Sequence, residues 1–167
     1  LFVGEFAQSL YHSRRLLTEY DPEAHQALAY TLGQDLSIAG HLLSIYDLWY
    51  LGYPDQALQH AEAGVAYATK MNHPFSRMFV ECFKSRLHRW RGEVERVDEL
   101  ADAQMRAWTE HAMQLGYAGA MLDGAWVMSE EGHPERAIDQ YKEALSAWLS
   151  TGMANHLPEF WAVLAQM

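Results

Sequence analysis

The chain has 167 residues, of which 50% are hydrophobic and 13% aromatic, so it can bury a sizeable core and fits one domain or one compact repeat array. Its 12 basic and 22 acidic residues give a net charge of -10, which disfavours nucleic acid and anionic membrane surfaces as partners. The single cysteine, Cys82, excludes an internal disulfide, and nothing resembles a signal peptide or a bilayer-spanning run, so we expect a cytoplasmic protein.

Apolar residues recur every three or four positions along the whole chain, and the strict alternation that is typical of strands is absent. All five prolines follow a break in this pattern, and acidic residues often come soon after them. Both features are typical of a first helical turn, where proline lacks no needed N–H and an acid complements the helix dipole. The predicted helices cover residues 5–20, 22–31, 36–51, 54–71, 74–91, 93–112, 117–131, 134–151 and 156–166.

Glycines fall near the opposite ends of these helices, where a residue with positive φ can close a helix. Three of them, at 52, 92 and 132, are forty residues apart. A period near forty with two helices per period predicts stacked antiparallel hairpins that bury their apolar faces against one another. We therefore expect an all-α, TPR-like superhelix of about 8–9 helices that forms one domain over residues 1–167. The glycines expected to close helices are Gly4, Gly33, Gly52, Gly92, Gly116, Gly132 and Gly152.

The stretch "LGYPDQAL" at 51–58 returns as "EGHPERAI" at 131–138. The small residues that follow each stretch have the spacing of the second helix of a tetratricopeptide (TPR) repeat, where they let paired helices approach. The unit between them is degenerate, with Val97 in place of the key alanine. Because the period exceeds the usual TPR length, a HEAT-like array is the alternative. The repeat signature consists of Gly52, Pro54, Ala57, Gly92, Gly132, Pro134, Ala137, Tyr141 and Ala144.

The succession "LWYLGYPDQAL", "HPFS", "LHRWRGE", "GAWVMSEEGHPERAI" and "LSAWLSTG" resembles the TPR-like C-terminal region of large bacterial proteins that join a predicted AAA-type ATPase to a nucleotide cyclase or another effector domain. The resemblance covers nearly the whole chain. It implies a sensing or protein-interaction module whose partners include the ATPase and effector domains of the parent chain, with the chemistry left to those domains. The sequence itself has no phosphate-binding G-x-x-x-x-G-K-[ST] motif.

No local motif predicts catalysis or a cofactor. The nine histidines form no H-E-x-x-H or H-x-H motif, so we expect no metal site, and His73, His133 and His156 are expected to cap helices or pack in turns. Cys82 lies on the apolar side of its helix, where we expect a buried, inert thiol. An enzyme would have to assemble its site from residues far apart in sequence, which remains an alternative.

Two arginines on the apolar side of the helix at 74–91 are the main anomaly. Arg86 falls among the rings of that side, and Arg89 lies at its edge. Each could pack its stem among rings and pair with an acid such as Asp47 or Asp123, or it could contact a ligand in a concave groove. In TPR arrays the first helix of each pair lines this groove. The predicted groove residues are Tyr46, Trp49, Tyr50, Arg86, Arg89, Trp90, Trp126 and Glu130.

Aromatic rings with a few arginines are typical of peptide-binding hot spots, although the same rings could simply fill a core. We therefore expect a non-catalytic interaction and sensing module that binds a protein or peptide segment in an aromatic groove. The alternative is a sensor in which the arginines and rings enclose a small anionic ligand.

The ends of the chain are those expected of a segment cut from a longer protein. Gly4 is expected to lie in the turn of a hairpin whose first helix precedes Leu1, and the final helix is expected to leave Phe160, Trp161 and Leu164 uncovered. We therefore expect self-association into a homodimer through these ends.

Overall fold

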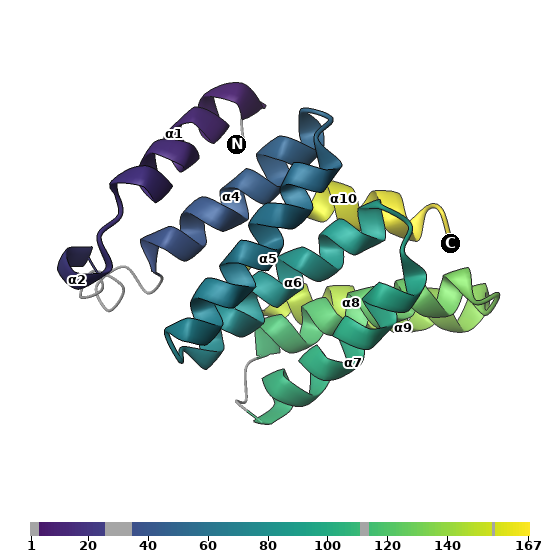
Figure 1. Cartoon of the computed structure of the whole chain (residues 1–167). Coiled ribbons are helices and arrows are strands. Elements are labelled where there is room, and N and C mark those ends of the chain that lie inside the picture. The colour runs from purple at the N-terminus through teal and green to yellow at the C-terminus, as the bar shows by residue number, and fades with distance from the viewer. Residues whose placement is uncertain (1–3, 26–34, 111–113, 155) are drawn as a thin grey trace. The chain divides into compact units, whose positions relative to one another are not determined.

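A computed structural model describes residues 4–25, 35–110, 114–154 and 156–167 (Figure 1). Within these ranges the regular structure is entirely helical, and sequential helices pack as antiparallel neighbours, which confirms the predicted all-α class. The chain divides into two compact units, Leu1–Leu87 and His88–Met167, and each is described by itself below. A single domain over residues 1–167 stays a prediction.

The helix bounds agree with the predicted ones to within two residues in most cases. The exceptions are α8, which begins three residues earlier than expected, and the predicted helix at 22–31, whose part beyond His25 lies outside the described residues. The boundary between the two units falls inside α6. The helices are α1 (Phe6–Glu19), α2 (Pro22–His25), α4 (Leu36–Tyr50), α5 (Pro54–Lys70), α6 (Pro74–Trp90), α7 (Val94–Glu110), α8 (Gln114–Glu130), α9 (Pro134–Ser150) and α10 (Leu157–Leu164).

The turns at the three evenly spaced glycines share one backbone conformation. Gly52, Gly92 and Gly132 have φ of 85°, 71° and 89°, in the left-handed region that glycine adopts without strain. At each turn the glycine N–H donates to the carbonyl three residues back, and the next N–H reaches one five residues back. The predicted helix ends are thus confirmed at these positions.

Gly116 does not end a helix, so that prediction was wrong. It lies inside α8, where a Cβ would come within 2.0 Å of the Trp108 ring on α7. A glycine is required here because α7 and α8 approach closely, and the sequence alone does not distinguish this role from that of a glycine that ends a helix. Gly33 lies outside the described residues.

The second helix of each hairpin buries the same positions, counted from the glycine that precedes it. Small residues at these positions let neighbouring helices approach: a Cβ at Gly64 of α5 would lie 3.1 Å from Val80 of α6 and 3.3 Å from His41 of α4. The degenerate hairpin keeps the register, because Val97 is also fully buried. The buried sets are Ala57, Ala61, Gly64 and Ala68 in α5, Val97, Ala101, Gln104 and Trp108 in α7, and Ala137, Tyr141, Ala144 and Trp148 in α9.

In unit 1, α1 lies beside α4, and α4 lies beside α5 (Figure 1). The approach of α1 is close, since a Cβ at Gly40 would lie 3.0 Å from the Leu17 side chain. Asp35 caps α4 by accepting from the N–H groups of Ser37 and Ile38, and its other oxygen accepts from the Tyr20 hydroxyl at 2.5 Å.

In unit 2, the core lies among α8, α9 and α10. Phe160 of α10 is 1% exposed and packs edge-on against Trp148, with ring centroids 5.2 Å apart. The expectation that Phe160 is uncovered was therefore wrong, because α9 covers it, and Leu164 is partly buried against the same cluster. Trp161 is 53% exposed. Self-association through the chain ends stays a prediction. Of the three apolar residues of α10 that were expected to be uncovered, only Trp161 is exposed.

Candidate functional site

Two of the predicted groove residues of unit 1, Tyr46 and Arg86, belong to a cluster of rings on α4 and α6. Phe75, Phe79 and Phe83 follow one another at successive turns of α6, with centroid distances of 5.8 and 5.2 Å. The Tyr46 ring of α4 meets Phe83 edge-on at 5.3 Å. The Arg86 guanidinium carbon lies 5.9 Å from the Phe83 centroid, and its Nη1 donates to the Tyr46 hydroxyl. We call Phe75, Phe79, Phe83 and Arg86 the aromatic row.

The members of the aromatic row are all half-buried, whereas Tyr46 is buried beneath them. Trp49 is also half-buried, and Tyr50 is 52% exposed and stacks on Phe6 with centroids 4.6 Å apart. Unit 1 thus carries partly exposed rings on two neighbouring helices.

Arg89 has a different environment from Arg86. It belongs to unit 2, is 5% exposed, and lies between two acids on other helices. Its Nη2 donates to Glu159 Oε1 of α10 at 2.5 Å, and its Nε lies 3.6 Å from Asp123 Oδ1 of α8. The Trp90 indole N–H donates to the same Glu159 oxygen at 3.0 Å. Burial raises the pKa of the nearby Tyr141 hydroxyl to about 12, and the Arg89 charge opposes this shift.

The two alternatives for the arginines are thereby separated. Arg89 has the packed, ion-paired arrangement, with Asp123 among its partners as expected and Glu159 as a partner that the sequence did not suggest. Arg86 contacts a tyrosine hydroxyl and a ring face. Arg86 and Arg89 are three residues apart and so lie on nearly the same side of α6, and only the packing of other helices decides which of them is covered.

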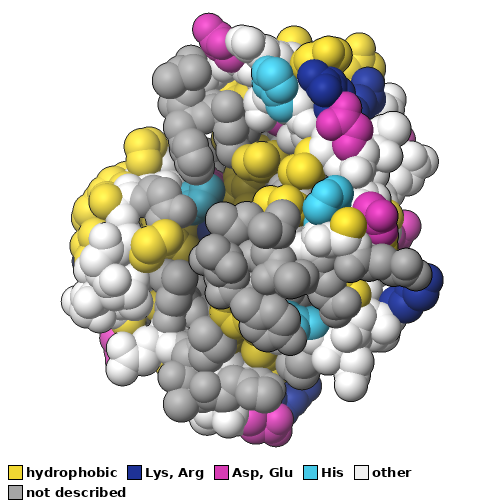
Figure 2. All heavy atoms as spheres, turned by 90° about the vertical axis from the view of Figure 1, so that its left-hand side faces the viewer, with side chains coloured by type: hydrophobic (Ala, Val, Ile, Leu, Met, Phe, Trp, Pro, Cys, Tyr) yellow, Lys and Arg dark blue, Asp and Glu magenta, His cyan; other side chains and the backbone are white. Residues whose placement is uncertain are grey.

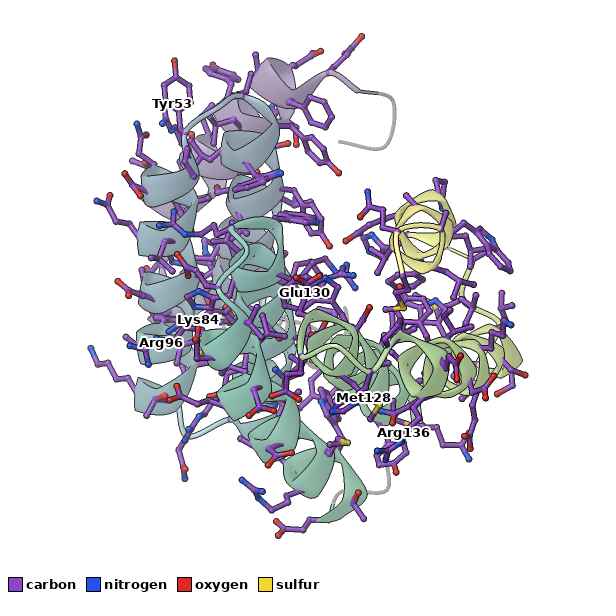
Figure 3. The ribbon with its side chains drawn as sticks, turned by 90° about the vertical axis from the view of Figure 1, so that its right-hand side faces the viewer. Tyr53, Lys84, Arg96, Met128, Glu130 and Arg136 are labelled. Carbon is purple, nitrogen blue, oxygen red and sulfur yellow. The ribbon has the colours of Figure 1, made fainter. Side chains whose placement is uncertain are left out.

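The remaining predicted groove residues of unit 2 lie on α6 and α8. Trp90 and Trp126 are half-buried, whereas Glu130 in the last turn of α8 is exposed. Figure 3 labels Glu130 beside the turn that joins α8 to α9, where Arg136 of α9 is also exposed. A groove that joins all eight predicted residues stays a prediction.

Two histidines between α4 and α5 were not singled out from the sequence. The Nδ1 atoms of His41 and His60 lie 3.3 Å apart, and both rings are half-buried. Burial lowers both pKa values, that of His41 to about 4 with a further contribution from His60, and for His60 the Arg14 charge adds to the shift. His73 caps α6, since its Nδ1 accepts from the Ser76 N–H at 3.2 Å. In the described part of the chain no three His, Cys, Asp or Glu side chains gather as metal ligands.

Several charged side chains elsewhere lie in exposed pairs of opposite sign. Examples are Arg15 with Glu19 at 2.8 Å and Arg96 with Glu99 at 3.0 Å. On the face shown in Figure 2, basic side chains lie in separate places with acidic ones beside them. Cys82 is half-buried, less buried than expected. Among the described residues no helix is both long enough and apolar enough to cross a membrane.

Two serines in the packing between α1 and α4, Ser9 and Ser13, were not singled out from the sequence. Asp47 of α4 was expected as a partner of an arginine, but neither of its carboxylate oxygens has a hydrogen-bond partner among the described residues. Ser13 and Asp47 are buried, and Ser9 and Ser13 both line a cleft in unit 1. The forty-residue register could have revealed Asp47, because the positions forty and eighty residues later are Leu87 and Val127.

Comparisons with protein-family models, with curated proteins and with solved structures found no match to this chain.

Proposed function

We propose that the chain is a non-catalytic interaction module whose hairpins stack as a TPR-like superhelix and bind a peptide segment. The observation that carries the proposal is the aromatic row. Three phenylalanine rings at successive turns of α6 are only half-buried and end at an arginine that lies over the last ring. Partly exposed rings beside an arginine are typical of binding hot spots, because each ring buries much area at a small entropy cost.

The chemistry of the aromatic row favours a peptide with apolar side chains and one carboxylate. The rings would cover the apolar side chains, and Arg86 would bind the carboxylate, since a guanidinium forms charge-assisted hydrogen bonds with acids. Unit 2 offers an example of this recognition within the chain, where Glu159 of a short helix accepts from both Arg89 and Trp90.

The role of the module within a longer protein is proposed from the resemblance of its sequence to the TPR-like regions of large bacterial proteins. In that setting the module senses a partner and passes the signal to an ATPase and an effector domain of a bacterial signalling protein. The spacing of the repeat supports this proposal, since the same hairpin positions are buried at forty-residue intervals.

The alternative function, a sensor for a small anion, receives less support. It needs both arginines to converge on one ligand. Arg89 is already paired with two acids, Asp123 and Glu159, so any anion would have to bind through Arg86 and its rings.

The test is an array of 15-residue peptides, each with one acid among apolar residues, probed with the full chain. Selected peptides should bind Arg86→Ala and Phe79→Ala at least about tenfold more weakly, which is the loss expected for hot-spot residues. Arg96→Ala is the matched control, because Arg96 is an exposed, ion-paired arginine. Circular dichroism checks that each variant is folded. Equal affinity of Arg86→Ala, Phe79→Ala and the control would contradict the proposal.

A further inference from the structure

A cleft of about 450 Å³ opens between α1 and α4, within unit 1 and on helices other than α6. This volume is in the range of small-molecule sites. Most of its lining residues come from α1, Glu5 is the residue just before that helix, and Leu43 belongs to α4. Among them are Glu5, Ser9, His12, Ser13, Leu16 and Leu43.

Two buried polar side chains at this cleft lack hydrogen-bond partners. Ser13 lines the cleft and is 2% exposed, and its hydroxyl has no partner among the described residues. Asp47 is 0% exposed, and neither of its carboxylate oxygens has a partner in the same part of the chain. Asp47 is not itself a lining residue, but it lies one turn after Leu43 on α4 and therefore on the same side of that helix. Burial raises the pKa of the Asp47 carboxyl, the nearby Ser9 hydroxyl opposes this shift, and Ser9 itself lines the cleft.

The repeat shows that packing does not require a carboxylate at position 47. The two positions that correspond to it, forty and eighty residues later, are Leu87 and Val127, which are 0% and 3% exposed. An aliphatic side chain therefore fills this place in the other hairpins.

The same comparison applies to α1. It begins two residues after Gly4, which has φ of 84°, as α5 begins two residues after Gly52. In this register Ser9 and Ser13 correspond to Ala57 and Ala61, both fully buried. Ser9, Ser13 and Asp47 thus each replace an apolar residue of the repeat.

Burying a carboxylate or a hydroxyl without a partner is costly, so this arrangement is best explained by a group that donates hydrogen bonds to it. The site has the charge of a cation-binding site: Glu5 adds a second carboxylate at the wall, and no Lys or Arg is among its described lining residues. Leu16 and Leu43 offer apolar surface beside the polar atoms.

We propose that this cleft binds the ammonium group of a small primary amine, with Ser9, Ser13 and Asp47 around the ammonium and Leu16 and Leu43 along the carbon stem. The site is separate from the aromatic row and goes beyond the proposed peptide binding. The two sites also prefer opposite charges, because the cleft would bind an ammonium group and the aromatic row would bind a carboxylate.

The test is an NMR titration of the full chain with 1-aminopentane, with 1-pentanol as the neutral probe of the same length. We expect saturable shifts of α1 and α4 amides with the amine only. Asp47→Asn should weaken the amine at least about tenfold, which is the loss of one charge-assisted contact. Asp139→Asn, an exposed acid on α9, should leave the affinity unchanged. A capped Gly-Lys-Gly peptide distinguishes the source: binding equal to that of the amine indicates a lysine side chain of a partner, and weaker binding indicates a free amine.

Two further variants use the residues of the repeat itself. Asp47→Leu should abolish amine binding and raise the Tm, because Leu87 fills the equivalent place in the next hairpin. Ser13→Ala introduces the alanine that the repeat has at the corresponding position and should weaken amine binding at least about threefold. This variant tests the proposal if a variant at position 47 does not fold. Equal binding of amine and alcohol, or unchanged amine affinity in Asp47→Asn or Ser13→Ala, would overturn the proposal.

Discussion

Replacing Gly116 by alanine tests the closest helix approach in unit 2. The added Cβ would lie 2.0, 2.1 and 2.5 Å from three atoms of the Trp108 ring. Carbon atoms in contact lie about 3.5–4.0 Å apart, so the ring or α8 would have to move by about 1.5 Å. Trp108 is 2% exposed and cannot swing into solvent without leaving a cavity.

The expected cost follows from these distances. Forcing atoms into a packed core costs about 1–3 kcal/mol, and expelling a buried Trp costs about 3–5 kcal/mol. Alanine gains about 1 kcal/mol of helix propensity over glycine. We therefore expect Gly116→Ala to lower the free energy of unfolding by about 2–4 kcal/mol and the Tm by about 5–15 °C. Urea and thermal unfolding, followed by circular dichroism and tryptophan fluorescence, measure both.

A matched control lies one turn further along the same helix. A Cβ at Gly119 would meet only one Trp148 atom at 3.6 Å, an ordinary contact. Gly119→Ala should therefore stabilise the chain by about 0.5–1 kcal/mol. The cost of Gly116→Ala should shrink when Trp108 is replaced by leucine, because the smaller side chain leaves room. If Gly116→Ala proved as stable as Gly119→Ala, the close packing of α7 on α8 would be refuted.

Three other predictions concern charge and backbone conformation. Folding lowers the His41 pKa from its usual 6.5 to about 4 and also lowers that of His60, so the free energy of unfolding should fall by about 1–3 kcal/mol as the pH drops from 6.5 towards 4. Urea unfolding at several pH values measures this dependence, and His41→Asn should flatten it. An unchanged pH dependence in that variant would count against the prediction. Glu159→Gln removes the carboxylate that pairs with Arg89, so it should lower the free energy of unfolding by about 1–3 kcal/mol and speed amide exchange in α10. Unchanged exchange would show that α10 does not depend on this pair. Gly132→Ala should cost about 1 kcal/mol in thermal unfolding, because φ is 89° and no neighbour lies within 4 Å of the added Cβ, and a neutral result would contradict a left-handed turn there.

The local signals of the fold could be predicted from the sequence because they act within one turn of helix. Proline at the start of α5 and α9 and glycine after α4, α6 and α8 are short-range effects, and the structure has them at the expected positions. The forty-residue register also predicted which side of α9 is buried, where Ala137, Tyr141 and Ala144 are fully buried.

The features that could not be predicted depend on contacts between distant segments. Gly116 and Gly132 look alike in sequence, and only the position of the Trp108 ring shows that the first serves helix approach. Phe160 is covered by Trp148, which a helix pattern alone does not reveal. The aromatic arc that was predicted around Arg86 is present, but its hydrogen bond to Tyr46 joins residues forty positions apart.

Differences between the hairpins locate the candidate amine site. A repeat sets which positions must be apolar for packing, so a polar residue at such a position needs a reason other than the core. Arg89 has its reason in Glu159 and Asp123, since the buried charges compensate one another. Asp47 has no such partner among the described residues. The two proposals also predict opposite effects in one experiment: a soluble amine should leave acidic peptides bound at the aromatic row, and Asp47→Leu should remove amine binding without changing peptide affinity. Loss of both activities in that variant would mean that the two regions are not independent.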